Sequence, residues 1–196
     1  ATETDAIVNS RLVEFFAYSG HGVSFSTENA LHYKKGTSDI SHSENEFHDV
    51  FNSRSSEIRF GGKNKWAILY TCNQLTNSGS PEKEQNIFKM MEGNRLIMGF
   101  SSIMYLDSRE GTLFGQYAGS GYNYVDSFID AAKKYQPQRK GGDSIARVIG
   151  HKNARSDSMY DTHLQVIPQS SWYKNKPEDY VYHATVTILH TGETIK

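Results

Sequence analysis

Three short apolar runs divide the first half of the chain into predicted strands. Residues 11–18, 65–71 and 95–100 are rich in aliphatic and aromatic side chains, and polar or glycine-rich segments end each run. Runs of this length between turn residues are typical of buried strands. Strands that are apolar on both faces favour a mainly parallel sheet, because helices cover both faces of such a sheet.

Two segments predict helices around these strands. Residues 80–82 offer a capping serine, a proline and an acid in the order that begins a helix, and Gly93 would end it. Over 123–135 apolar side chains recur at helical spacing. A further helical piece is predicted near 43–52, inside the long polar connection 23–64. The order strand, helix, strand favours the α/β class.

The last quarter of the chain is predicted to add β-structure to the same domain. Residues 163–167 and 180–189 have strand patterns, whereas 144–149 fit either a strand or a helix. The sequence contains no internal repeat and no convincing linker. We therefore predict one domain over 1–196, or a fragment of one, whose C-terminal β-rich part is 144–196.

Composition excludes several classes of function. The 21 Lys+Arg and 22 Asp+Glu leave a formal net charge of −1, without the basic excess of a nucleic-acid binder. No apolar run approaches the ~20 residues of a membrane-spanning helix. The single cysteine, Cys72, excludes a disulfide framework. Residues 1–6 are polar and acidic, so we expect a mature exported chain or an excised piece, with the cytoplasm as the alternative location.

His21 and Cys72 each follow an apolar strand. Because the carboxyl ends of neighbouring parallel strands meet at one edge of a sheet, we expect the two side chains to share a crevice. An imidazole beside a thiol accepts its proton and later protonates a leaving group. The backbone N–H groups of Gly22 and Cys72 would then form an oxyanion hole. The alternative is a structural one, in which Cys72 fills the core and His21 is a hydrogen-bonded turn residue.

These motifs carry a family resemblance. Tyr-Ser-Gly-His-Gly at 18–22, with Cys72 after the next strand, resembles the His-Gly…Cys dyad of the caspase–gingipain–clostripain–separase group of cysteine peptidases. The resemblance covers roughly 11–135. It looks closest to uncharacterised bacterial members that share this pattern and the Gly-Phe-Ser-Ser pattern found at 99–102.

The resemblance implies a caspase-like three-layer sandwich that acts on a peptide or protein substrate without a metal or organic cofactor. The chain also departs from the group. The caspase signature Gln-Ala-Cys-x-Gly is replaced by Tyr-Thr-Cys-Asn-Gln at 70–74. Ten residues precede the first strand, where the family fold has two further strands, so the N-terminal strands are expected to be missing or to lie outside this chain.

In that peptidase group, loops at the same strand ends build the specificity pocket. Ser101 and Ser102 would reach the crevice, and Asp107 follows them. A carboxylate there would select Arg or Lys substrates through charge-assisted hydrogen bonds. Glu110 is the fallback acid, and the alternative for both acids is an ordinary surface role.

The sequence leaves three hypotheses about the function open. The first is a cysteine endopeptidase that uses His21 and Cys72. The second is a catalytically inactive caspase-like binding module, which the unusual residues around Cys72 and the short N-terminal part favour. The third, a sugar-binding domain, rests only on the abundance of Tyr and Trp. No metal site is predicted, although His42, His48 and Asp49 form a weak candidate set.

Overall fold

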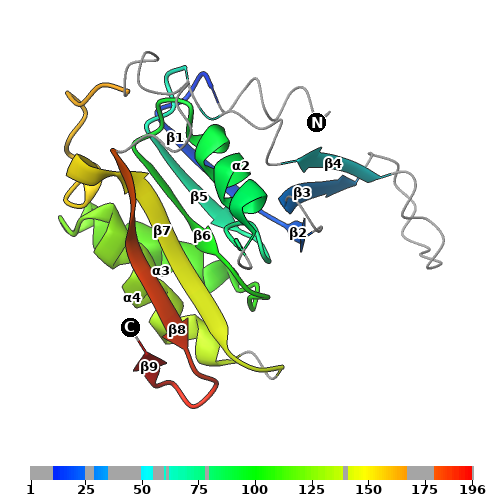
Figure 1. The fold of residues 1–196 in the computed structure, drawn as a ribbon. Coiled ribbons are helices and arrows are strands. Elements are labelled where there is room, and N and C mark those ends of the chain that lie inside the picture. Colours follow the sequence, from blue (N-terminus) through cyan, green and yellow to red (C-terminus); the bar gives the residue numbers. More distant parts are fainter. Residues whose placement is uncertain are drawn as a thin grey trace.

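The computed structural model describes residues 11–24, 29–34, 50–54, 60, 62–77, 80–138, 141–166 and 179–195. Within these residues the chain forms a six-stranded sheet with helices on both faces and a separate three-stranded sheet (Figure 1). The α/β class is therefore as predicted. None of the helices in these ranges is long and apolar enough to cross a membrane.

The larger sheet has the strand order β1-β5-β6-β7-β8-β9. Its strands are β1 (Phe15–Ser19), β5 (Trp66–Tyr70), β6 (Leu96–Phe100), β7 (Ser144–His151), β8 (Tyr180–Ile188) and β9 (Thr194–Ile195). The pairings β1·β5 and β5·β6 are parallel, and the other three are antiparallel. The predicted mainly parallel sheet is thus right for the first three strands and wrong for the last three.

The number of helices between strands explains this change of direction. One helix, α2 (Pro81–Met91), carries the chain back to the start of the sheet, so β6 runs parallel to β5. Two helices, α3 (Ser108–Gly119) and α4 (Tyr124–Tyr135), follow β6 and pack against each other. The second helix returns the chain to the edge at which β6 ended, and β7 starts there in the opposite direction. Short 3-10 turns lie at Gln136–Gln138 and Lys152–Ala154.

Two helices begin with side-chain caps, of which the sequence indicated only Ser80. The Ser80 side chain accepts a hydrogen bond from the Lys83 N–H, and Pro81 is the first residue of α2. Asn123 caps α4 by accepting from the Asp126 N–H. Such caps satisfy N–H groups that have no partner within the helix. Helix α3 was not predicted; Asp107 caps it.

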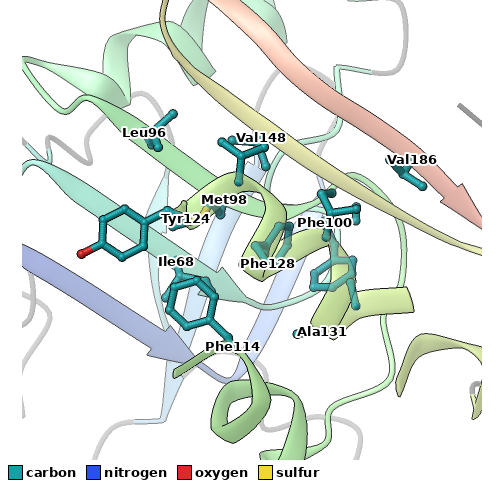
Figure 2. Close-up of a cluster of buried hydrophobic side chains, with 14 of the residues drawn as sticks. Ile68, Leu96, Met98, Phe100, Phe114, Tyr124, Phe128, Ala131, Val148 and Val186 are labelled. Carbon is teal, nitrogen blue, oxygen red and sulfur yellow. The ribbon is translucent and has the colours of Figure 1, made fainter. Parts of the chain in front are cut away.

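The alternating side chains of the sheet divide the core into two layers. Ile68, Met98 and Phe100 pack with Phe114 and Phe128 from α3 and α4 on one face (Figure 2). The intervening residues of the strands pack against α2 on the other face, among them Leu69 and Ile97. The period of two along each strand therefore places helices on both sides of one buried sheet.

A buried ion pair lies at the edge of the sheet where β5 and β6 begin. Arg95 donates from Nε and Nη2 to the two carboxylate oxygens of Asp157, over 2.6 and 2.8 Å. The indole Nε1 of Trp66 donates to the same carboxylate over 2.8 Å. Asp157 is only 2 % exposed. Since an isolated buried charge is very costly, these three side chains depend on one another.

Two local predictions were wrong. The helix expected near 43–52 is a strand at its end, because β4 (Val50–Arg54) pairs with β3 (Asn29–Lys34); the part before Val50 lies outside the described residues. The smaller sheet is completed by β2 (His21–Ser24), which also pairs antiparallel with β3. The strand expected at 163–167 is absent from residues 163–166, where the Leu164 N–H instead closes a turn on Asp161. Residue 167 lies outside the described ranges.

Candidate active site at the ends of strands β1 and β5

The register between β1 and β5 bears directly on His21 and Cys72. The two strands are parallel neighbours, as predicted, and their pairing runs from Phe15↔Trp66 to Ser19↔Tyr70. Each residue of β1 is thus opposite the residue 51 positions later, and Cys72 lies 51 positions after His21. The register extended by two residues would place His21 opposite Cys72, but the pairing ends at Ser19, and the exposed His21 begins β2, where it pairs with His32. The Gly20 N–H carries the pairing one step further by donating to the Tyr70 carbonyl over 3.2 Å.

A close approach at Gly22 shows that the two chain segments stay together beyond the paired residues. A Cβ atom on Gly22 would lie 2.2 Å from the carbonyl oxygen of Cys72 and 2.2 Å from Oγ1 of Thr71. No real side chain tolerates such distances, so the position requires glycine. The first residues of β2 are therefore pressed against the Thr71–Cys72 peptide.

Cys72 lies just beyond the end of β5 and faces the layer of α3 and α4. Trp66, Ile68 and Tyr70 belong to the core on that face, and the half-buried Cys72 side chain packs against the same cluster. The next residue, Asn73, has φ 58°, a left-handed conformation that asparagine tolerates better than most residues. The chain therefore turns sharply directly after the cysteine.

The segment after β6 supplies the contacts of the Cys72 turn. The Met104 N–H donates to Cys72 Sγ over 3.5 Å, and the thiol donates to the Met104 carbonyl over 3.9 Å. The Asn73 N–H donates to the Ser102 carbonyl, and the Leu75 N–H to the Phe100 carbonyl, each over 2.9 Å. The cysteine thus sits on a turn fixed to the neighbouring strand, with a backbone donor directed at its sulfur.

The two serines predicted to bind substrate lie beside this turn, directly after β6, and form hydrogen bonds with β7. The Ser101 N–H donates to the Ile145 carbonyl over 2.9 Å, and Ser102 Oγ accepts from the Ile145 N–H over 2.8 Å. Ser101 Oγ is buried and has no hydrogen-bond partner in the part of the chain that the structure describes. Both serines therefore have structural roles at the strand end, whatever they contact in a complex.

The Asp107 carboxylate forms an ion pair with Arg109 in the first turn of α3, the helix that Asp107 caps. Its carboxylate accepts from the Arg109 backbone N–H over 2.9 Å and from the guanidinium over 2.5 Å. These hydrogen bonds from Arg109 hold the pKa of Asp107 below its ordinary value. Arg109 in turn lies over the ring of Tyr135, 5.1 Å from its centre. A basic substrate would have to share or displace Arg109 in order to pair with Asp107.

Glu110 points into the protein rather than toward solvent. It is fully buried, and its Oε2 accepts a hydrogen bond from Gln136 Nε2 over 2.5 Å. Burial raises the pKa of Glu110 to about 8, so the carboxyl is mostly neutral at pH 7. Its Oε1 and the hydroxyl of the nearby Tyr70 have no hydrogen-bond partner among the described residues. In this conformation the predicted fallback acid lies in the core.

The sequence interpretation missed Met104 and Gln136. Their contacts join residues about 30 positions apart, and no local pattern marks them. No group of three or more His, Cys, Asp or Glu that could hold a metal ion occurs in the described ranges. The weak metal candidates His42, His48 and Asp49 lie outside those ranges.

Comparison with known proteins gives one finding. A family model described as "Domain of unknown function (DUF6345)" matches residues 9–179, which include both strand-end motifs and the strands from β1 to β7. No curated protein matches the chain. Because the matching family model covers most of the sequence, this chain belongs to the DUF6345 family.

Proposed function

We propose that this protein is a cysteine endopeptidase in which Cys72 is the nucleophile and His21 is the general base and acid. The observation that supports this most strongly is the approach of Gly22 to the Thr71–Cys72 peptide, together with the register of β1 against β5. Both bring the backbone beside His21 next to the Thr71–Cys72 peptide, which supports pairing of the imidazole with the thiol. The sharp turn at Asn73 is consistent with a nucleophile presented at the end of a strand.

The proposed reaction has two steps. His21 takes the thiol proton, and Cys72 Sγ attacks the carbonyl carbon of the scissile peptide. The C–N bond then breaks, and His21 gives the proton to the departing amine, which leaves a thioester on the cysteine. In the second step water attacks the thioester while His21 accepts its proton. The C–S bond breaks, the carboxylic product leaves and the proton returns to the sulfur.

Backbone N–H groups would stabilise the negative oxygen in both steps. Gly22 and Cys72 supply the proposed donors, from two segments that approach each other closely at the Thr71–Cys72 peptide. The Met104 N–H already donates to the sulfur, where it would stabilise negative charge on the attacking atom. These donors come from three separate backbone segments rather than from flexible side chains.

The arrangement of β1, β5 and β6 supports a caspase-like fold as the context of this dyad. Three parallel strands lie between α2 on one face and α3 with α4 on the other, and the candidate dyad follows the first two strands. Ligands of open α/β sheets bind at such carboxyl ends. Cleavage after Arg or Lys belongs to the same proposal and requires Asp107 to exchange Arg109 for a substrate cation.

The decisive experiment compares wild-type protein with Cys72→Ala and His21→Ala on a peptide library. We expect hydrolysis by the wild type, no hydrolysis by Cys72→Ala and severe slowing for His21→Ala. His163→Ala is a matched control, because His163 is exposed and lies outside the candidate site. Equal rates of peptide hydrolysis by the wild type and Cys72→Ala would refute the proposal. A folded wild type that cleaves nothing in the library would favour the inactive binding module instead.

A further inference from the structure

The side chain of Gln136 holds the backbone of Tyr105 through two hydrogen bonds. Its Oε1 accepts from the Tyr105 N–H over 2.8 Å, and its Nε2 donates to the Tyr105 carbonyl over 2.9 Å. Gln136 lies at the end of α4 and is 1 % exposed. One buried amide therefore satisfies both polar groups of a residue 31 positions earlier in the chain.

The remaining contacts fix the orientation of this amide. Ser144 Oγ donates to Gln136 Oε1 over 3.1 Å, and Gln136 Nε2 donates to Glu110 Oε2 over 2.5 Å. The oxygen thus accepts twice and the nitrogen donates twice, so the whole hydrogen-bonding capacity of the amide is used. A flipped amide would direct its N–H groups at the Tyr105 N–H and would lose these bonds.

The backbone that Gln136 holds is the one that reaches the candidate nucleophile. Met104, directly before Tyr105, is buried and donates its N–H to Cys72 Sγ. The neighbours Ile103 and Tyr105 are exposed, and residues 103–107 belong to no strand or helix. Sheet pairing therefore does not hold this segment, and the amide of Gln136 takes over that role.

We propose that Gln136 is a positioning residue for Cys72, acting through the Tyr105 backbone to keep the Met104 N–H directed at the sulfur. This inference rests on the proposed function, because a fixed donor matters only where the sulfur reacts. Gln136 itself makes no contact with the sulfur that the structure describes. The neutral carboxyl of Glu110 fits this role, since it accepts from Gln136 without placing a full charge in the core.

The test measures the rate at which iodoacetamide alkylates Cys72 in the folded protein at pH 7. The chain has one cysteine, so every label reports on this site. We expect Gln136→Leu to react about tenfold more slowly than the wild type, because the sulfur loses a donor that stabilises its negative charge. Gln136→Asn keeps the amide on a side chain that is one methylene shorter, so we expect an intermediate rate of alkylation. This variant provides the test if Gln136→Leu does not fold.

Two controls separate positioning from simple stabilisation. Gln116→Leu replaces an exposed glutamine of α3, and Asp126→Asn weakens an ion pair with Arg155 at the opposite end of α4. Both should alkylate within about twofold of the wild type even where Tm falls. An unchanged rate in folded Gln136→Leu or Gln136→Asn, or a faster one caused by greater exposure of the thiol, would overturn the inference. Absence of peptide hydrolysis by the wild type would refute only the proposed function, because the alkylation comparison does not depend on it.

Discussion

Replacing Gly22 by alanine tests the geometry on which the candidate site depends. The added Cβ would lie 2.2 Å from two atoms, whereas ordinary van der Waals contact starts at 3.4 Å. One of these atoms is the backbone carbonyl oxygen of Cys72, and the other belongs to Thr71, which is fully buried. The backbone oxygen cannot rotate away, so the segments must separate by about 1 Å, and overpacking of this kind costs about 1–3 kcal/mol.

The matched control is Gly115→Ala in α3. A Cβ at Gly115 meets nothing within 4 Å, so alanine should stabilise the helix by about 0.5–1 kcal/mol. Urea denaturation followed by circular dichroism would measure both variants under the same conditions. Adding Thr71→Ala to Gly22→Ala should recover only part of the loss, because the carbonyl oxygen remains. If Gly22→Ala were as stable as Gly115→Ala, the chain at Gly22 would not lie against Cys72, and the argument for the dyad would lose its basis.

Three further predictions concern the buried and charged groups. Glu110→Gln should change how stability depends on pH, because folding raises the pKa of Glu110 from its ordinary 4.5 to about 8. The contribution of Glu110 to stability is therefore greatest below pH 4.5 and falls by up to about 1.4 kcal/mol per pH unit between these values. Denaturation series from about pH 5 to 8.5 should show that Glu110→Gln lacks this slope. Asp157→Asn should cost about 3–5 kcal/mol in urea denaturation, because it leaves the Arg95 guanidinium buried without its carboxylate; a loss below about 1 kcal/mol would argue against a buried pair. Asp107→Asn should remove most of the preference for Arg or Lys in peptide-library profiling, and cleavage after acidic or large apolar residues in both proteins would exclude this carboxylate from substrate selection.

The sequence predicted elements well where one local signal dominates. The strand β5 is a continuous apolar run between polar segments, and α2 begins with Ser80 and Pro81. Helix α3 was harder to recognise, because Gly111 and Gly115 lower its helix propensity. A usable signal was nevertheless present, since Asp107 and Glu110 have the spacing of a capping box.

The relationship of the candidate residues was only partly predictable. That His21 and Cys72 each lie two residues beyond the end of one of two neighbouring parallel strands followed from strand order alone. By contrast, the environments of Asp107 and Glu110 depend on a helix that was not predicted: its first turn brings Arg109 to one acid and buries the other. The direction of β7 could not be predicted either, because it depends on two consecutive helices rather than on the residues of the strand.

The antiparallel return of β7 has a consequence for how the family could diversify. Because β7 starts where β6 ends and β8 finishes beside Ser144, the edge that carries Cys72 also collects the connection before β7 and the connection after β8. The Arg95–Asp157 pair lies at the opposite edge, where β5 and β6 begin. Insertions or substitutions in several independent connections can therefore reshape what surrounds the cysteine without touching the ion pair that supports the fold. Such a separation allows one scaffold to acquire different partners while its stability is inherited unchanged.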